Sequence, residues 1–426
     1  MSGQRVVFFG AGGYAEEHFE ALNQQYAPVA FGDNDPKKHG TSLMGFPILS
    51  LDEIEVKYPR CQYFITVNVL AKPYVIESLL ARGVDRSRIV NFEDYKRYVS
   101  CWQLEMFMWY SYVNNSESLF FCCSDFGKNS SPQVPLNHDA LAETIEKFAA
   151  MREEIIGQLN SPAKATADNP CLGCRNVKEG LWRASRRVHI LNIMHRSICN
   201  FKCSYCNASN ALDSSSPLDV EKMLAFLRFV KDKKIIDGDT EIHLTSGEIS
   251  IHPLRDKIMA EVKDNPCTIY TNASAYSEKI GELLSGGRSR LYPSIDAGTR
   301  ETFAMIKGVD MFDRVCENLR RYSLDGSVQL KYIMLPGLND NEADIEGFID
   351  LCSRLKVKAV DVTRDTNKIA QFDEHTIKMI ARMLNALHDR GIKAYAQDNA
   401  FGATPNDQRR IEEEIAELGR VRRGCE

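Results

Sequence analysis

Residues 188–206 read VHILNIMHRSICNFKCSYC, an apolar run followed shortly by three cysteines. The run VHILNIMH has the continuous hydrophobicity of a strand buried on both faces of a parallel sheet. Cys199, Cys203 and Cys206 follow it in the spacing C-x3-C-x2-C. Three thiolates this close together can surround one iron–sulfur cluster, whereas a 4Fe–4S cluster commonly has four cysteine ligands. The spacing therefore predicts a cluster with one open iron, to which the amine and carboxylate of an amino acid can bind.

Two other interpretations of these cysteines stay open on spacing alone. The three thiolates and the nearby His195 would together make four ligands for a zinc ion. Alternatively, positions i, i+4 and i+7 would place the cysteines on the inner face of a helix. Asn200 and Ser204 are poor helix formers, which counts against the helix.

From residue 187 onward, strand patterns alternate with helix patterns. The predicted strands are VHILNIMH, TEIHLTSG, PCTIYTNA, RLYPSIDA, SVQLKYIML and VKAVDVTRD. Six such βα units predict a curved, mostly parallel sheet, either a partial (β/α)6 barrel or a doubly wound sheet. In barrel-like folds the active groups lie at the carboxyl ends of the strands, where the three cysteines follow the first strand. We assign residues 187–400 to this domain and residues 401–426 to a C-terminal helix.

Residues 1–95 predict a small, Rossmann-like, doubly wound α/β domain. A strand (RVVFFG) leads into Gly10-Ala11-Gly12-Gly13-Tyr14-Ala15, which matches G-x-G-x-x-A, and a helix pattern follows. Further strands are predicted in PVAFGDND, QYFITVNV and RIVNF. Gly10 and Gly12 would let backbone amides approach a phosphate, and Asp33 stands where a ribose-binding carboxylate is found in such domains. A nucleotide-type ligand is therefore predicted, with an empty docking lobe as the alternative.

Residues 96–186 are predicted to be a helical connector. The segment YVSCWQLEMFMWYSYV reads as helical and aromatic, DALAETIEKFAAMREEIIGQL as a second helix, and SPAKATADNP as a linker. Just after the linker, Cys171 and Cys174 form a C-x2-C pair, which suits two ligands on one metal ion. This pair is a candidate auxiliary metal site, with a reduced structural pair as the alternative.

Several ordered segments resemble the radical S-adenosylmethionine (SAM) superfamily. The C-x3-C-x2-C loop has an aromatic residue, Tyr205, before its last cysteine. Thr245-Ser246-Gly247-Glu248 looks like the family's G-G-E motif, with serine at the first glycine. Tyr270-Thr271-Asn272 is similar to the T-N-G segment, with alanine in place of the glycine, and Ser294-Ile295-Asp296 to the S-[IL]-D segment. Together with the run from Lys331 to Asp340, the resemblance covers about residues 187–370.

The resemblance implies a partial radical SAM barrel that carries a 4Fe–4S cluster and SAM. Cys199, Cys203 and Cys206 would hold the cluster. One electron from the reduced cluster would cleave SAM to a 5′-deoxyadenosyl radical, which abstracts a hydrogen atom from the substrate. A flavodoxin-type electron donor is implied, because buried anionic clusters have strongly negative potentials.

The resemblance also implies roles for residues at the strand ends. Gly247 and Glu248 would hold the methionyl amine of SAM, and Tyr205 would flank the adenine. Ser294 is a candidate for the ribose hydroxyls, and Asn272 is a further candidate SAM contact. The polar residues expected to face the substrate are His195, His243, Lys331, Asp361, Arg364 and Asp398. None of these can be assigned as the catalytic acid or base.

The expected substrate is a small or carrier-linked metabolite. The N-terminal stretch AFGDNDPKKHGTSLMGFPILSLDEI resembles the N-terminal lobe of bacterial sugar acyltransferases, which implies a nucleotide-linked sugar as one candidate. A peptide-modifying radical SAM enzyme is the alternative, although only Cys425 lies beyond the predicted barrel, where that subfamily carries a cysteine-rich extension. A non-catalytic iron–sulfur or nucleotide-binding protein is an alternative of another class.

The bulk composition describes an ordinary globular protein. Of the 426 residues, 44% are hydrophobic and 26% charged, and the formal net charge is −5. This charge gives no reason to expect a nucleic-acid partner. No signal peptide or membrane span is apparent, so a cytoplasmic location is expected. Of the 13 cysteines, five are expected to be buried apolar residues in a reducing compartment: Cys61, Cys101, Cys267, Cys316 and Cys352.

Overall fold

The computed structural model divides the chain into two compact units. The first comprises Met1–Glu105 and Ile155–Arg186, and the second comprises Met106–Glu154 and Arg187–Glu426. The residues that the structure describes are 5–68, 71–90, 92, 95–113, 116–122, 132–161, 163, 166, 169–174, 176–183, 187–195, 199–206, 220–365, 371–396 and 404–423. Cys123, Asp398 and Cys425 lie outside them.

The first unit contains an α/β sheet of five strands. Its described elements are β1 (Val6–Phe9), α1 (Gly13–Tyr26), β2 (Ala30–Gly32), β3 (Ser42–Leu43), β4 (Phe46–Leu49), α2 (Leu51–Lys57), β5 (Gln62–Ile65) and α3 (Lys72–Ala81). The strand order is β3-β4-β2-β1-β5, and only β3 is antiparallel to its neighbour. The predicted alternation of strands and helices is confirmed. Of the predicted strand RIVNF, Arg88 ends a 3-10 turn, and the described residues pair at one bridge, Ile89 with Tyr63.

The second unit contains a sheet of ten strands in the order β17-β16-β15-β14-β13-β12-β11-β7-β8-β9. The six predicted strands are confirmed as β11 (Ile190–Met194), β12 (Glu241–Thr245), β13 (Cys267–Thr271), β14 (Arg290–Pro293), β15 (Ser327–Met334) and β16 (Ala359–Arg364). Each pairs in parallel with the next. A seventh parallel strand, β17 (Lys393–Ala396), pairs with β16 and was not predicted.

The prediction that residues 98–113 are helical is wrong. Only α4 (Trp102–Met106) is helical, between β6 (Tyr95–Ser100) and β7 (Phe107–Val113). Aromatic residues favour strands, and here they alternate: Tyr110 is buried, while Trp109 packs 5.7 Å from Phe120 across the strand pair. β7 runs parallel to β11, and β8 (Ser116–Phe120) and β9 (Gln133–Pro135) continue the sheet. In the first unit, β6 pairs with β10 (Lys178–Arg183).

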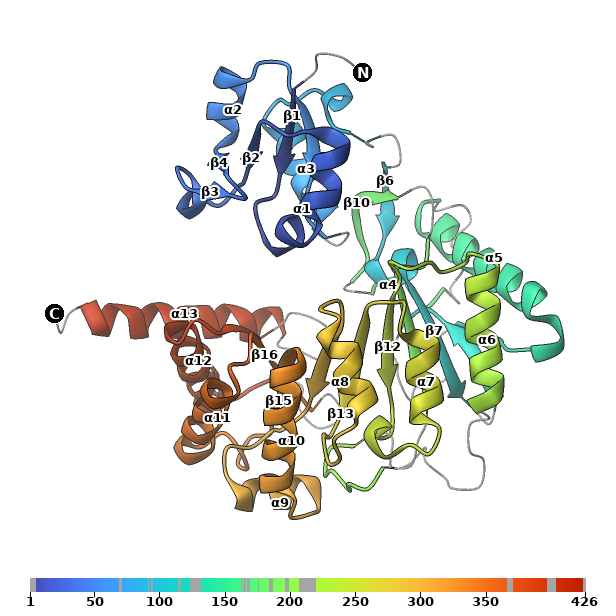
Figure 1. Ribbon diagram of the computed structural model, residues 1–426, viewed down its shortest axis with the longest axis vertical. Coiled ribbons are helices and arrows are strands. Elements are labelled where there is room, and N and C mark those ends of the chain that lie inside the picture. The colour runs from blue at the N-terminus through green and yellow to red at the C-terminus, as the bar shows by residue number, and fades with distance from the viewer. Residues whose placement is uncertain are drawn as a thin grey trace. The chain divides into compact units, whose positions relative to one another are not determined.

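Helices follow one another along one face of the large sheet (Figure 1). They are α6 (Val220–Asp232), α7 (Arg255–Val262), α8 (Glu278–Ser285), α9 (Arg300–Lys307), α10 (Phe312–Asp325), α11 (Glu342–Leu355) and α12 (Glu374–Asp389). The predicted helices at residues 139–159 and at the C-terminus are confirmed as α5 (Leu141–Leu159) and α13 (Pro405–Arg423). No helix in the described part of the chain is both long and apolar enough to span a membrane.

The two faces of the large sheet differ in polarity. Residues that point toward the helices are apolar and buried, such as Leu244 and Leu330, and the Tyr332 ring lies 4.7 Å from Phe348 of α11. Side chains alternate between the faces of a strand. The opposite, inner face therefore carries the polar residues Asn192, Glu241, His243, Thr268, Tyr270, Arg290, Tyr292, Gln329, Lys331 and Asp361.

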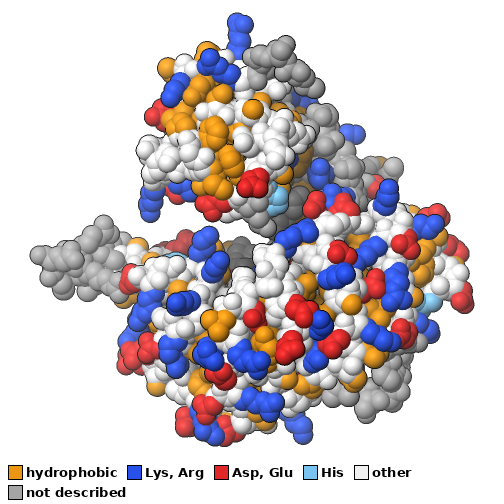
Figure 2. Space-filling view, viewed as in Figure 1, with side chains coloured by type: hydrophobic (Ala, Val, Ile, Leu, Met, Phe, Trp, Pro, Cys, Tyr) orange, Lys and Arg blue, Asp and Glu red, His pale blue; other side chains and the backbone are white. Residues whose placement is uncertain are grey.

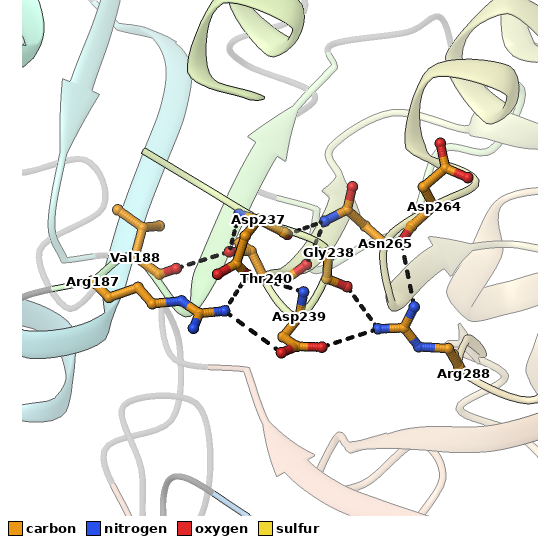
Figure 3. A network of polar contacts seen from close by, with 9 residues as sticks. All are labelled: Arg187, Val188, Asp237, Gly238, Asp239, Thr240, Asp264, Asn265 and Arg288. Atoms are coloured by element: carbon orange, nitrogen blue, oxygen red, sulfur yellow. Dashed lines mark hydrogen bonds and ion pairs between the residues drawn. The ribbon is translucent and has the colours of Figure 1, made fainter. Parts of the chain in front are cut away.

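A network of charged and amide side chains links the segments that precede neighbouring strands, at the amino edge of this sheet (Figure 3). The Arg187 guanidinium bonds the Asp237 carboxylate, and Arg288 donates to the Gly238 carbonyl and lies 3.5 Å from Asp239. The Asn265 amide donates to the carbonyls of Asp237 and Thr240. On the face shown in Figure 2, acidic and basic side chains are interspersed.

Candidate cofactor site at the cysteine loop

The cysteine loop, residues 199–206, is fixed by the end of helix α9. The Lys202 and Ser204 amides donate to the carbonyls of Lys307 and Ile306, at 3.0 and 2.9 Å. These carbonyls belong to the last turn of α9, where helix carbonyls have no partner within the helix. Gly308 ends the helix with φ +67°, and a Cβ there would lie 2.9 Å from the Lys202 carbonyl oxygen. A glycine at this position therefore allows the cysteine loop to lie against the end of α9.

Tyr205 of the loop forms a buried triad of side chains with Asp296 and Lys307. The Tyr205 hydroxyl donates to the Asp296 carboxylate at 2.6 Å, and the Lys307 ammonium donates to both groups. Lys307 is 1% exposed and Asp296 is fully buried. The Tyr205 ring packs against Ile306, Ile333 and Leu335. The second Asp296 oxygen accepts from the Ile333 amide, so the polar side-chain atoms of the triad are all hydrogen-bonded and hold the loop in one position.

The carboxyl ends of three neighbouring strands share an unusual backbone. After β12, β13 and β14, the residues Ser246, Ala273 and Asp296 have φ of +67°, +55° and +58°. Such left-handed conformations cost about 1–3 kcal/mol each in residues other than glycine. Ser246 and Ala273 occupy the positions at which the sequence pattern led us to expect glycine. The backbone geometry supplies the physical reason for that expectation.

Glu248 lies inside the protein, directly after the turn that ends β12. Its carboxylate is fully buried and accepts hydrogen bonds from the Ser250 amide, the Thr271 hydroxyl and the Asn272 amide. Burial raises the pKa of this carboxyl, against the effect of these hydrogen bonds. Glu248 therefore joins the ends of β12 and β13. Its assignment as the partner of the SAM ammonium stays a prediction.

Asn272 joins the end of β13 to the cysteine loop. Its side-chain amide donates to the side-chain oxygen Oδ1 of Asn200 at 3.0 Å and lies 3.8 Å from the Cys199 sulfur. Asn200 in turn bonds the Ser274 hydroxyl at 3.1 Å. The structure thus brings together Cys199, Asn272 and Glu248, which the sequence analysis predicted separately.

Comparisons with known proteins agree with this arrangement. Residues 193–352 match the family described as the Radical SAM superfamily. A radical SAM domain occupies this segment. The match begins in β11 and ends in α11, so it includes the cysteine loop, the three strained strand ends and the Tyr205–Asp296–Lys307 triad.

Curated relatives match about half of this chain. The GTP 3′,8-cyclase of Chlorobaculum tepidum is 28% identical over 230 residues, which are 51% of this chain and 66% of that protein. A probable GTP 3′,8-cyclase of Saccharolobus islandicus is 27% identical over 181 residues, 42% of this chain and 57% of that protein. The chain therefore spans just under two thirds of the first relative and less of the second.

Solved structures of radical SAM proteins are more distant. Streptococcus suis SuiB bound to S-adenosylmethionine has 14% identity and a TM-score of 0.40, with 73% of this chain and 74% of that chain covered. A radical SAM methyltransferase from Sphaerobacter thermophilus has 19% identity and a TM-score of 0.38, with coverage of 51% and 69%.

The donor set of the loop fits the 4Fe–4S cluster that a radical SAM domain carries. All three thiols lie within electrostatic reach of one another, and burial raises the pKa of Cys199 to about 11 and also raises that of Cys203. The Lys307 ammonium opposes the rise at Cys203. Ligand binding would deprotonate the thiols, and Lys307 provides a positive charge beside the thiolates.

The zinc alternative finds no support in the geometry. His195 is 1% exposed, and its ring lies 6.1 Å from that of His252. Burial, and to a smaller extent the charge of His252, lowers the pKa of His195 to about 3. Among the described residues, no three Cys, His, Asp or Glu side chains converge as they would around a single metal ion. A cubane binds each thiolate at a different iron, so its ligands stand farther apart than those of one ion.

The other predicted residues are placed as follows. His243 lies on the inner face of β12 and bonds Glu241 at 3.0 Å, and Asp361 accepts hydrogen bonds from Tyr292 and Gln329. Ser294 follows β14 and forms a bridge with Lys331. Arg364 ends β16. Of the five isolated cysteines, Cys316 is half-buried and the other four are buried, as predicted.

In the first unit, two of the predicted nucleotide contacts, Gly10 and Asp33, lie against other residues of the same unit. A Cβ at Gly10 would lie 2.3 Å from Val67, so this glycine is required by the neighbouring chain. The Asp33 carboxylate accepts from the Ala11 amide and the Lys38 ammonium, both at 2.8 Å. A Cβ at Gly12 would meet no atom within 4 Å. Of Gly10 and Gly12, it is therefore Gly12, at the start of α1, that faces open space.

Cys171 and Cys174 lie in a tight turn of the first unit, as predicted. The Cys174 amide donates to the Cys171 carbonyl at 3.2 Å, and Gly173 between them has φ +75°. Both thiols are reduced. Within the described ranges, no third Cys, His, Asp or Glu joins them in a metal site.

Sequence reasoning missed Lys307 and gave no role to Asp296. Asp296 was noted only within a motif, and Lys307 looked like an ordinary basic residue in the last turn of a helix. One available signal was position: Phe303 and Lys307 are four residues apart on one face of α9, and Phe303 is apolar and buried.

Proposed function

We propose that this protein is a radical SAM enzyme that reductively cleaves SAM and abstracts a hydrogen atom from a small or carrier-linked substrate. The observation that carries this proposal is the cysteine loop, which presents three thiols above the strained strand ends of a radical SAM domain. When bound, the cluster and SAM supply one-electron reductive chemistry. A flavodoxin-type protein is the proposed electron donor.

The residues of the chain have definable roles in this proposal. Cys199, Cys203 and Cys206 would bind the cluster. The Asn272 amide lies beside the Cys199 sulfur, where it can donate a hydrogen bond to a thiolate. Lys307 and Asp296 orient the loop through Tyr205. Tyr205, Gly247, Glu248, Asn272 and Ser294 are retained as the proposed SAM contacts.

A nucleotide-like small molecule is the proposed class of substrate. Both relatives described above are named as GTP cyclases. Modification of a peptide is the second candidate. Reconstituted protein incubated with SAM, dithionite and, separately, deuterium-labelled nucleotides, nucleotide sugars and peptides would distinguish them, because only the true substrate transfers deuterium into 5′-deoxyadenosine.

The decisive experiment for the activity is anaerobic incubation of the reconstituted protein with SAM and dithionite. Formation of 5′-deoxyadenosine and methionine is expected. A protein that binds about four irons, the content of one 4Fe–4S cluster, and yet forms neither product would be a non-catalytic iron–sulfur protein, and the proposal would be wrong.

For the first unit we propose a nucleotide-type ligand at the Gly-rich turn, with Gly10 and Asp33 shaping the turn and Gly12 facing the ligand. Gly12→Val has room in the free protein, so it separates ligand binding from folding. Calorimetry with nucleotide sugars and NAD should show binding that this variant abolishes. Absence of binding to the folded wild type would leave the unit as a docking lobe.

An auxiliary metal at Cys171 and Cys174 is a further proposal. The double alanine variant should lose iron or zinc while the spectrum of the loop cluster is retained. Unchanged metal content in the folded variant would make the pair purely structural.

A further inference from the structure

Lys331 is a lysine on the inner face of the sheet. It lies in β15, pairs in register with Asp361 of β16 and forms a bridge with Ser294 after β14. Its side chain is half-buried, and its polar neighbours on this face include Tyr292 and Gln329. Lys331 therefore lies between the strand ends and the polar middle of the sheet.

The ammonium of Lys331 has no hydrogen-bond or ion-pair partner among the described residues. The two carboxylates whose charges act on it are already bonded to other donors. Asp361 accepts from the Tyr292 hydroxyl and, at 2.7 Å, from the Gln329 amide. Asp296 accepts from Tyr205, Lys307 and the Ile333 amide.

A half-buried ammonium without a partner is only partly solvated, and a group of this kind with a perturbed pKa is a candidate for a ligand-binding site. Burial lowers the pKa of Lys331, and the Lys307 charge adds to this effect, whereas Asp296 and Asp361 oppose it. The neighbouring wall is aromatic, because the Tyr270 ring lies 4.9 Å from that of Tyr292 and 6.0 Å from that of His243. A cation beside aromatic rings suits a ligand with an anionic group and a flat or apolar body.

We propose that the Lys331 ammonium binds an oxyanion of the substrate, a carboxylate or a phosphate. This inference rests on the proposed function, since it concerns the substrate of that same domain. Beside it, Tyr292 and Gln329 both donate hydrogen bonds to Asp361. These bonds fix the three side chains and leave the Lys331 ammonium free to bind the substrate.

The test uses the full-length, anaerobically reconstituted protein saturated with SAM and without reductant. Inorganic pyrophosphate and malonate serve as probes of the two oxyanion classes, and binding is measured by calorimetry. At least one probe is expected to bind the wild type. Lys331→Met should weaken this binding by about ten- to a hundredfold, the effect of losing one charge-assisted hydrogen bond. Lys331→Arg should retain most of it.

Lys358→Met, which removes an exposed lysine just before β16, is the matched control and should leave probe binding unchanged. The ligand-free Lys331→Met protein should melt no lower than the wild type, because an unpaired charge has been removed. A melting temperature several degrees lower would make Lys331 a structural residue and overturn the proposal. Lys331→Gln repeats the test with a polar side chain.

Two further outcomes would also overturn it. The first is that neither probe binds the wild type. The second is that Lys331→Met weakens the binding of SAM while probe binding is unchanged, which would show that the lysine binds the SAM carboxylate. The proposed function is judged separately by 5′-deoxyadenosine formation in the wild type. A protein that binds pyrophosphate through Lys331 without cleaving SAM would contradict only the proposed function.

Discussion

The two edges of the large sheet are built on different principles. At the amino edge, Arg187, Asp237, Asp239 and Arg288 are partly or largely exposed, and each charge lies near an opposite one (Figure 3). At the carboxyl edge, three consecutive strands end in left-handed residues that are not glycine. The same edge buries a lysine–aspartate pair, and both ring nitrogens of His195 are without a partner in the described structure.

This difference shows where the domain tolerates local strain. Strained backbone and unpaired polar groups persist only where surrounding structure holds them, and they concentrate at functional sites. The amino edge of a barrel-like fold serves stability, whereas the carboxyl edge carries the chemistry. Substitutions at the two edges should therefore differ both in size and in which property they change.

The largest effect is expected at the cysteine loop. Alanine at Cys199, Cys203 or Cys206 should abolish SAM cleavage, because two thiolates cannot replace three that already leave one iron open. Cys316→Ala, in α10, is the control and should retain full iron content and product formation. The measurements are iron per protein and 5′-deoxyadenosine by chromatography. Full activity in any of the three loop variants would exclude that cysteine as a ligand.

The next largest effect concerns Lys307. Lys307→Met leaves the fully buried Asp296 carboxylate without its cation, and breaking a buried pair in this way costs about 3–5 kcal/mol. The double variant Lys307→Met/Asp296→Asn should recover part of the lost stability. Urea denaturation of the protein without its cofactors measures the unfolding free energy of the single and the double variant. A single variant as stable as the wild type would show that the pair contributes nothing to the fold.

The sequence allowed the strand order along the chain and the cysteine loop to be predicted, because each rests on local patterns. Six parallel strands followed from alternating apolar runs, and the loop from spacing. The triad could not be found this way: Tyr205 and Lys307 are about a hundred residues apart and meet only because α9 ends beneath the loop. Likewise, β7 was missed because its aromatic residues suit both a helix and a strand.

The role of Glu248 shows a second limit of sequence patterns. The motif predicted Glu248 as a SAM contact, which stays a prediction. Its three hydrogen bonds to the ends of β12 and β13 come from tertiary contacts that no local pattern records. Asp33 in the first unit is a parallel case, since its carboxylate binds the turn it was predicted to accompany.

A pH-dependent effect of about 3 kcal/mol is expected from Glu241, on the inner face near the amino edge. Burial raises its pKa, but bonds to His243, Arg290 and Thr268 outweigh burial and lower the pKa from 4.5 to about 2. Because the folded pKa is depressed, this stabilisation is complete above about pH 5 and is lost as the pH falls toward 2.

Urea denaturation of wild type and Glu241→Gln at several pH values between 3 and 6 provides the measurement. The difference in unfolding free energy between them should shrink steadily as the pH falls. A difference that is constant across this range would show that the carboxylate has the same pKa in the folded and unfolded protein.

A matched glycine pair tests how the cysteine loop is seated. Gly308 and Gly337 have φ of +67° and +74°, but only at Gly308 would a Cβ meet the cysteine loop, 2.9 Å from the Lys202 carbonyl. Both alanine variants should lose about 1–2 kcal/mol from the left-handed backbone. Gly308→Ala should in addition lower the iron content after reconstitution, while Gly337→Ala should not. Equal iron contents would show that the contact with α9 does not position the loop.

The smallest effect is expected at the amino edge. Asp239 is 82% exposed and lies 3.9 Å from Arg187 and 3.5 Å from Arg288, so its charge is shared between two arginines that water also solvates. Asp239→Asn should cost roughly 0–1 kcal/mol, as exposed ion pairs do, and raised salt should remove the difference. SAM cleavage should be unchanged, because the site lies at the opposite edge. A loss comparable to that of Lys307→Met, or a change in product formation, would show that the two edges are coupled.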